Sequence, residues 1–400
     1  MVLVADSDGV AAVTRAVASA TLVAFDLEFL SADRLVPTLC LVQVGWIHVP
    51  LDAPEAAIVA ASPEIALVDP LAVDVRPLIE ALAAHPRTVA HAARQDLGLL
   101  ATRFGVAMPA IADTQVMAAF AGIGEQVGLA ALANELCGTR LDKEQQWTAW
   151  DRRPLSPAQL TYAIADVRYL PAIYATLAAR LGRRLGWALA ESALVAAEAT
   201  AAASVTAETA WEHVSGVRGL DPLSAATAMQ LAAWRHRVAS ELDRPLGQLL
   251  TDRTLIDLAK HRPGSDGAIR ATKGLSRTAA DRADEIAAAL ARARPEHAPS
   301  RVLARPMSTR AQRWAEVLLS IAHLVTDETG VASRLLATRS DAEELARTID
   351  EGGLAAAQAL PAFATWRREL LGEPFAGWLR GDVALVGDLA SPHGLRLAPR

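Results

Sequence analysis

The chain has 400 residues, enough for two or three domains with sizeable cores. Its composition, 52% hydrophobic but only 4% aromatic, favours a mostly helical protein packed from small side chains. A net charge of −6 argues against a protein coated in basic patches. No uncharged apolar stretch reaches the ~18 residues of a membrane-spanning helix, and the N-terminus lacks a secretory signal. We therefore expect a cytoplasmic protein without a membrane segment.

Charge is distributed unevenly along the chain. Residues 1–216 carry 14 basic and 23 acidic side chains, whereas residues 217–300 carry 13 and 10. This distribution fits a metal-dependent catalytic domain followed by a module that contacts phosphates.

The first part of the chain alternates strand and helix patterns, which indicates an α/β fold. The first strands follow one another closely, so we expect hairpins and a mixed sheet rather than a parallel one. Beyond about residue 114 the pattern is helical throughout. The expected strands are 2–5, 21–28, 39–44, 65–68, 88–91 and 111–113, with helices at 10–20, 75–84 and 95–103.

Two loop-rich segments divide the chain. Two glycines and a proline between Gly216 and Pro222 mark one boundary, and the segment from Pro295 to Pro306 marks another. We expect the last twenty residues to be frayed. The predicted domains are therefore an α/β domain over 1–205 and two helical domains over 217–295 and 306–385.

An acidic pair closes the strand that begins at Leu22. A strand has a side-chain period of two residues, so Asp26 and Glu28 project from the same face. Neighbouring carboxylates repel each other and are costly to desolvate, and a divalent metal ion between them would offset both effects. Taken alone, the pattern is equally explained by two solvated acids where the strand ends and a loop begins.

A second candidate lies in a predicted helix that Ser156 caps and Pro157 opens. Tyr162 and Asp166 are four residues apart, so they share one helix face. The alternative is a surface aspartate and a tyrosine packed at the edge of the core.

Two further segments carry candidate residues. His91 ends a predicted strand and Asp96 lies in the first turn of the next helix, where an acid can simply compensate the helix dipole. Lys143, Arg152 and Arg153 surround two tryptophans and could grip phosphates or stack on bases. The alternative is a loop whose tryptophans pack on the core.

Together these segments resemble the DEDD family of 3′→5′ exonucleases, in its tyrosine-bearing branch, and within it ribonuclease D. Four separated motifs occur in order over about residues 1–200. They are Pro37–Gln43, Leu67–Pro70, His91–Leu97 and Arg152–Ser156. The sequence departs from the family pattern at Leu27, Ser31 and Ile164, none of which is a proposed metal ligand.

The second half resembles the HRDC domain, the helical domain that RecQ-type helicases share with ribonuclease D. Residues 310–375 resemble a more divergent second copy. The matching segments are Leu231–Arg235, Asp252–Ala259, Arg262–Pro263 and Lys273–Ser276 in the first copy, and Arg334–Arg339 and Trp366–Gly372 in the second.

This resemblance implies a ribonuclease H-like mixed-sheet domain followed by two all-α domains. It also implies hydrolysis by two Mg²⁺ or Mn²⁺ ions roughly 4 Å apart. Asp26 would bridge both ions, Glu28 and Asp166 would hold the ion that activates water, and Asp96 would hold the second. Tyr162 would orient or help deprotonate the water, and nucleoside 5′-monophosphates would leave from a 3′ end.

The expected substrates are RNA 3′ ends, with transfer-RNA precursors implied by the family, and the expected state is a monomer. A DNA 3′→5′ exonuclease is the closest alternative, and a catalytically silent RNA-binding scaffold is an alternative of another class. The candidate substrate-binding residues are His91, Gln95, Lys143, Arg152 and Arg153.

Overall fold

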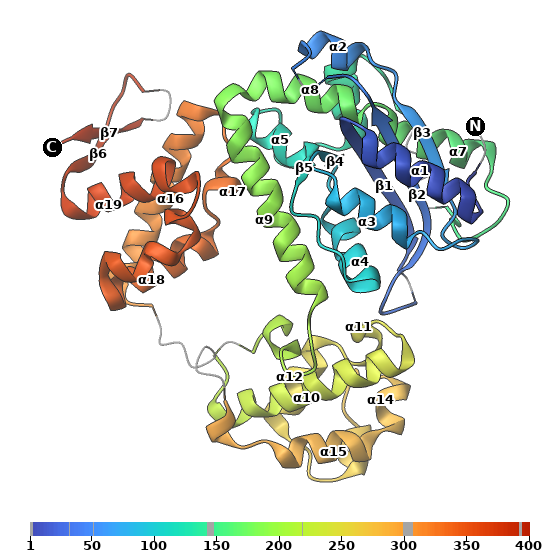
Figure 1. Ribbon diagram of the computed structural model, residues 1–400. Helices are drawn as coiled ribbons and strands as arrows, with labels where there is room; N and C mark the ends of the chain where they lie inside the picture. Colours follow the sequence, from blue (N-terminus) through green and yellow to red (C-terminus); the bar gives the residue numbers. More distant parts are fainter. Residues whose placement is uncertain are drawn as a thin grey trace.

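The computed structural model describes residues 3–31, 33–50, 52–141, 148–217, 219–298, 307–391 and 394–400. Figure 1 shows an α/β part, coloured blue to green, from which the long helix α9 (Leu185–Ala203) descends. One helical module lies at the lower end of this helix, and a second packs along its side. No helix in the described ranges combines the length and apolarity needed to cross a membrane.

A five-stranded mixed sheet forms the centre of the α/β part, in the order β3-β2-β1-β4-β5. The first three strands along the chain pair antiparallel, whereas β4 runs parallel to β1 and β5 parallel to β4, which confirms the mixed sheet. The expected strand at 2–5 is reduced to a single bridge between Val4 and Val68. The strands are β1 (Leu22–Leu30), β2 (Thr38–Ile47), β3 (Glu64–Val68), β4 (Thr88–Ala90) and β5 (Ile111–Asp113).

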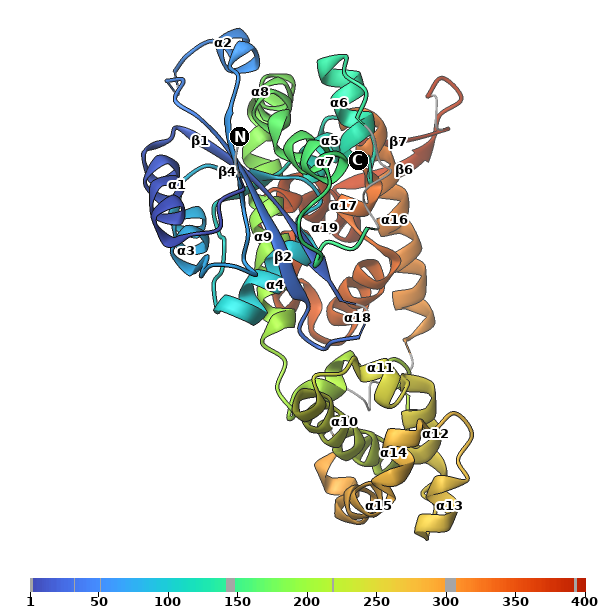
Figure 2. The ribbon, with the colours of Figure 1, turned by 90° about the vertical axis from the view of Figure 1, so that its right-hand side faces the viewer.

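Helices cover both faces of the sheet (Figure 2). Phe25 and Leu27 of β1 point into the core of one face, and Ala24 points into the core of the other. Side chains alternate along a strand, so Asp26 and Glu28 lie on the same face as Ala24. Leu27 points away from them, as expected. The first face packs on α1 (Ser7–Ser19), α3 (Arg76–Ala84) and α4 (Arg94–Phe104), and the second on α7 (Pro157–Arg168) and α8 (Leu170–Leu181).

The helix α9 closes the α/β part by packing against α4, β5 and α5. It is rich in alanine, which allows close approach and favours a helix. The remaining helices of this part are α2 (Glu55–Ala60), α5 (Thr114–Phe120) and α6 (Leu129–Cys137).

The two helical modules begin with the same series of elements. Each opens with a 21-residue helix that ends in a left-handed residue, Asp243 or Gly330. A four-residue helix follows, and then a helix that a threonine side chain caps, Thr251 or Thr338. Corresponding positions in the two modules are separated by the same number of residues, which supports a duplicated unit; the domain boundaries stay a prediction.

The first series is α10 (Pro222–Leu242), α11 (Leu246–Leu249) and α12 (Asp252–His261), and the second is α16 (Thr309–Thr329), α17 (Ser333–Leu336) and α18 (Arg339–Ala356). The first module continues with α13 (Asp266–Arg270), α14 (Arg277–Asp281) and α15 (Ala283–Arg292), and the second with α19 (Glu373–Arg380).

The end of the chain corrects two expectations. An antiparallel hairpin of β6 (Val383–Gly387) and β7 (Leu395–Pro399) occupies the segment that we expected to be frayed. The pattern beyond residue 114 is therefore not helical throughout.

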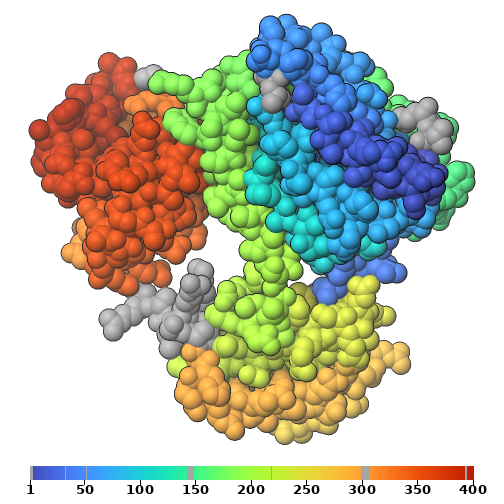
Figure 3. Space-filling model, viewed as in Figure 1, coloured from blue at the N-terminus to red at the C-terminus, as the bar shows by residue number. Residues whose placement is uncertain are grey.

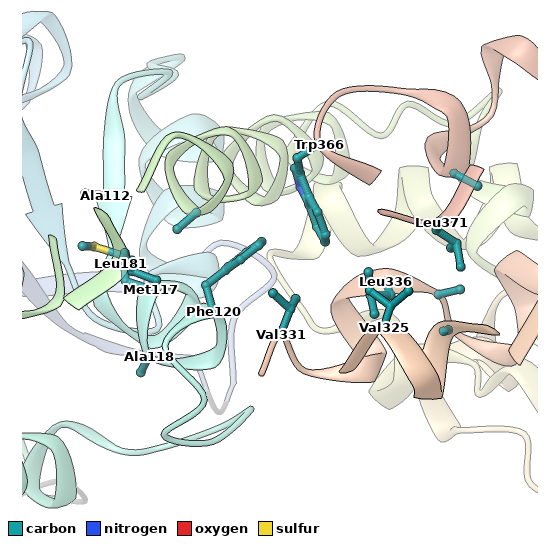
Figure 4. Close-up of a cluster of buried hydrophobic side chains, with 14 of the residues drawn as sticks. Ala112, Met117, Ala118, Phe120, Leu181, Val325, Val331, Leu336, Trp366 and Leu371 are labelled. Atoms are coloured by element: carbon teal, nitrogen blue, oxygen red, sulfur yellow. The ribbon is translucent and has the colours of Figure 1, made fainter. Parts of the chain in front are cut away.

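The two modules attach to the α/β part differently. The first has a core of its own and forms a separate lobe at the lower end of α9 (Figure 3). The second shares one continuous core with the α/β part, in which the Phe120 and Trp366 rings meet edge to face at 4.8 Å (Figure 4). The second module is therefore packed firmly against the α/β part.

A buried ion pair secures this shared core. Arg367 Nη2 lies 2.7 Å from Glu191 Oε1 of α9, and the two side chains are only 11% and 8% exposed. The Trp366 indole N–H donates to the other carboxylate oxygen at 3.2 Å, and Arg367 Nε donates to the Leu335 carbonyl at 2.7 Å. The Glu191 carboxylate is thus satisfied by two groups of the second module.

Arg367→Met is expected to lower the free energy of unfolding by about 3 kcal/mol, because Glu191 is left as a buried charge without its cation. Chemical denaturation measures the effect. Arg339→Met is the control in the same module, since the Arg339–Glu316 pair is 63% exposed on both sides and its loss should cost below about 1 kcal/mol. Equal losses in both variants would contradict the assignment, and adding Glu191→Met should recover stability only in the Arg367→Met background.

Candidate active site

Three carboxylates from two elements converge beside the end of β1. Asp26 and Glu28 project from this strand and Asp166 from α7, and one oxygen of each lies within 4.8 Å of the others. Together with Asp96 they line a pocket of about 360 Å³, here called the acidic pocket. The sequence-predicted set is therefore brought together in space.

The local sequence fixes where α7 begins and how closely it approaches the sheet. Ser156 and Gln159 form the capping box, and Pro157 occupies the first turn. At its other end α7 lies against β2 at Gly45, where an added Cβ would stand 3.3 Å from the Val167 carbonyl oxygen. The missing side chain therefore lets α7 come near enough to place Asp166 beside β1.

Asp96 reaches the acidic pocket from the first turn of α4, and it is 8% exposed. The turn before α4 contains Ala92 in a left-handed conformation, with φ of 55°. The buried Asp113 carboxylate accepts the backbone N–H groups of Ala92 at 2.9 Å, Ala93 at 3.0 Å and Gln115 at 2.8 Å. Asp113 thus holds the turn that delivers Asp96.

Sequence reasoning placed Asp113 at the end of a strand and assigned it no role. A signal was present, because an aspartate before a helix is a common N-cap, and Asp113 caps α5. The contact with the turn before α4 spans about twenty positions and has no local signature.

The acids of the pocket hold protons more tightly than free acids do. Burial, the largest cause, raises the pKa of Asp26 to about 7 and that of Asp166 to about 8. Burial and the charges of Asp26, Asp166 and Asp96 raise the pKa of Glu28 to about 9. Burial, followed by Asp26 and Asp113, raises the pKa of Asp96 well above its ordinary value. Four acids this close need a compensating positive charge.

The described side chains that line the acidic pocket do not supply that charge. Of the described residues that line it, none is a lysine or an arginine. Asp166 Oδ2 is buried without a hydrogen-bond partner in the described part of the chain. Carboxylate oxygens are the preferred ligands of Mg²⁺ and other hard divalent cations, so this donor set fits divalent metal binding.

Tyr162 lies one helical turn before Asp166 on the same face of α7, as expected, and lines the acidic pocket. Burial and the nearby acids raise the pKa of Tyr162 above its ordinary value. The buried Trp150 ring packs on the Tyr162 ring at 6.0 Å, which confirms that Trp150 is a core residue.

Two of the candidate substrate-binding residues also line the acidic pocket. His91 Nδ1 is 2.9 Å from the Thr114 hydroxyl, which itself donates to the Ala90 carbonyl. Burial lowers the pKa of His91 below its ordinary value. Gln95 is exposed at the mouth of the pocket. Their role as substrate contacts stays a prediction.

The structure places Arg153 differently from our expectation. Its guanidinium donates two hydrogen bonds to Asp69, at 2.5 and 2.7 Å. Its other three N–H groups donate to the carbonyls of Trp150, Arg152 and Cys40. All five donors of the side chain are used, so Arg153 ties the segment before α7 to the sheet and has no donor left for a phosphate.

The structure gives no support to the other two basic candidates as substrate contacts. Arg152 is exposed and is not among the residues that line it. Lys143 lies outside the described residues.

Comparisons with known proteins agree with this architecture. Residues 1–182 match the family model described as 3′-5′ exonuclease, and residues 224–294 match the model of the HRDC domain. The mixed sheet, the acidic pocket and the helical module define a 3′→5′ exonuclease that carries an HRDC domain.

Relatives that match over nearly the whole chain identify its family. Ribonuclease D of Acidiphilium cryptum is 33% identical over 96% of this chain and 94% of its own length, and ribonuclease D of Jannaschia sp. is 33% identical over 95% of each. The crystal structure of Escherichia coli RNase D, an exoribonuclease involved in structured RNA processing, matches with a TM-score of 0.78 and 26% identity over 95% of this chain and 98% of that one. The chain belongs to the ribonuclease D family of 3′→5′ exoribonucleases.

Gly45→Val is expected to lower kcat about a hundredfold, because a side chain at this position pushes α7 and Asp166 away from β1. Steady-state hydrolysis of an RNA oligonucleotide measures the loss. Gly186→Val is the control, since an added Cβ at Gly186 meets no atom within 4 Å. A wild-type kcat in Gly45→Val would show that the close approach of α7 is not required.

The stability of the metal-free protein is expected to fall as pH rises from about 4 to about 9. The folded-state pKa values of Asp26, Glu28 and Asp166, about 7, 9 and 8, exceed the ordinary values of 3.8, 4.5 and 3.8. The folded protein therefore binds more protons than the unfolded chain in this range, and deprotonation costs stability.

Thermal unfolding in a chelator should show this slope, and Mn²⁺ should raise Tm more at pH 8.5 than at pH 6 because metal ions replace the protons. Asp26→Asn should flatten the slope, whereas the exposed Asp8→Asn on α1 should leave it unchanged. A Tm that rises with pH in the chelator would contradict the prediction.

Proposed function

We propose that Asp26, Glu28, Asp96 and Asp166 hold two divalent ions, Mg²⁺ or Mn²⁺, and form with Tyr162 the catalytic site of this exoribonuclease. The observation that carries the proposal is the convergence of three carboxylates from β1 and α7 in a pocket whose described lining residues include no lysine or arginine. The products are nucleoside 5′-monophosphates from RNA 3′ ends.

When bound, the ions supply Lewis-acid stabilisation of the attacking and leaving oxygens. The chain supplies the arrangement of the ligands: β1 fixes Asp26 and Glu28 two residues apart, and the turn on Asp113 fixes Asp96. Tyr162 keeps its proton at neutral pH in the metal-free protein, since its pKa is raised. Its hydroxyl would orient the attacking water or help to deprotonate it.

The RNA 3′ end enters the acidic pocket past His91 and Gln95. Because the Thr114 hydroxyl donates to the Ala90 carbonyl, it accepts from His91 Nδ1, which fixes the ring of His91 beside the acidic pocket. We infer transfer-RNA precursors among the substrates from family membership; a monomeric state and a cytoplasmic location stay predictions.

The first helical module is proposed to contact RNA phosphates. Several of its cations are exposed and form no ion pair with a described residue, as a phosphate-binding surface requires. They are Arg253, Lys260, Arg262, Arg270 and Lys273.

Asp26→Asn is expected to lower kcat by at least about a thousandfold, because one of the carboxylates that would hold the ions loses its charge. Tyr162→Phe is expected to lower kcat about a hundredfold while the rise of Tm with Mn²⁺ remains. The substrates are a single-stranded RNA, the matched DNA, and a transfer-RNA precursor with a 3′ extension.

Asp8→Asn, an exposed acid on the opposite face of the sheet, is the control and should hydrolyse RNA like the wild type. Full activity of Asp26→Asn would overturn the metal site. Faster digestion of DNA than of RNA would contradict the assignment of RNA as the substrate. A transfer-RNA precursor that the enzyme does not shorten would exclude a role in transfer-RNA maturation.

A further inference from the structure

A second pocket adjoins the acidic pocket along α7. Its volume is about 810 Å³, and it shares two of its residues, Leu141 and Tyr162, with the acidic pocket. A volume in this range holds a ligand of nucleotide size or larger. We call it the upstream pocket; its walls include Arg140, Leu141, Thr161, Arg168 and Tyr169.

Two segments form the walls of the upstream pocket. One is the side of α7 that carries Thr161, Ala165 and Arg168, residues at helical spacing on a 12-residue helix about 18 Å long. The other follows α6, where Gly138 adopts a left-handed conformation with φ of 64°. This turn directs the chain back, so that Arg140 and Leu141 lie opposite α7.

The charge of the upstream pocket is opposite to that of the acidic pocket. Arg140 and Arg168 are exposed, and neither forms an ion pair with a described residue. No acidic side chain occurs among the described residues that line it. A cation in the last turn of α7 also suits the helix dipole, but this does not account for Arg140, which lies on another segment.

The shared residues determine what can occupy the upstream pocket. Tyr162 belongs to both pockets, so a strand whose scissile phosphate lies at the acids continues directly past this ring. The acids repel the phosphates of the strand, and the two arginines of the upstream pocket attract them. Aromatic rings beside such cations are typical of single-strand binding sites.

We propose that the upstream pocket binds the nucleotides immediately 5′ of the scissile phosphate, with Arg140 and Arg168 on their phosphates and Tyr169 beside a base. This inference rests on the proposed function. It makes the side of α7 away from the sheet the path along which RNA reaches the catalytic acids.

The test compares the full-length double variant Arg140→Gln, Arg168→Gln with the wild type on single-stranded RNA of increasing length. KM for an octanucleotide is expected to rise about tenfold, with kcat nearly unchanged and a smaller rise for a dinucleotide. The slope of log KM against log salt should fall by about 0.7 for each lost phosphate contact. The double variant Arg140→Lys, Arg168→Lys should recover most of the affinity.

Arg15→Gln is the matched control, because Arg15 is an exposed arginine of α1 on the opposite face of the sheet. An unchanged KM at every length in the Gln variant would overturn the proposal. The proposal would also be overturned if the Gln variant changed only the inhibition by a nucleoside 5′-monophosphate, because the pocket would then bind the product. If the wild type digests no oligonucleotide, the proposed function itself fails, and this outcome is distinct from both.

Discussion

The structure depends on the burial of four carboxylates beside the end of its central strand. Asp26 and Glu28 are fixed on β1 with apolar residues behind them, and Asp96 and Asp166 arrive from α4 and α7. Such a cluster destabilises the fold unless protons or metal ions occupy it. The elements around the acids must therefore be rigid enough to hold them together against their own repulsion.

The helix α9 connects the elements that hold the acids in place with the second helical module. Glu191 accepts hydrogen bonds from Trp366 and Arg367 on one side of α9. The next residue, Ser192, accepts the backbone N–H of Asp113 at 3.2 Å, and Asp113 holds the turn before Asp96. One turn of α9 thus contacts both the second module and the support of the acidic pocket. Among the described residues, the first module meets the α/β part at Asp243, which pairs with Arg34 and accepts the Val36 N–H at 3.2 Å.

The sequence allowed the acid positions to be predicted because each depends on local rules. The period of a strand placed Asp26 beside Glu28, and an N-cap serine followed by a proline placed the start of α7. The residues that it could not predict depend on contacts between distant segments. Arg153 was expected to bind substrate, and only its pairing with Asp69, 84 positions away, shows that its donors are used. Asp113 and Gly45 likewise act on elements far along the chain.

The burial of the four carboxylates also limits where arginines can lie near the scissile bond. Arg153 illustrates how an arginine neutralises a carboxylate in this fold, because it donates two hydrogen bonds to Asp69. An arginine inside the acidic pocket would neutralise Asp26 or Glu28 in this way and displace the metal ions. RNA still requires positive charge near the scissile bond. The arginines that we propose to bind phosphates meet both requirements, because they line the adjoining pocket and do not line the acidic pocket.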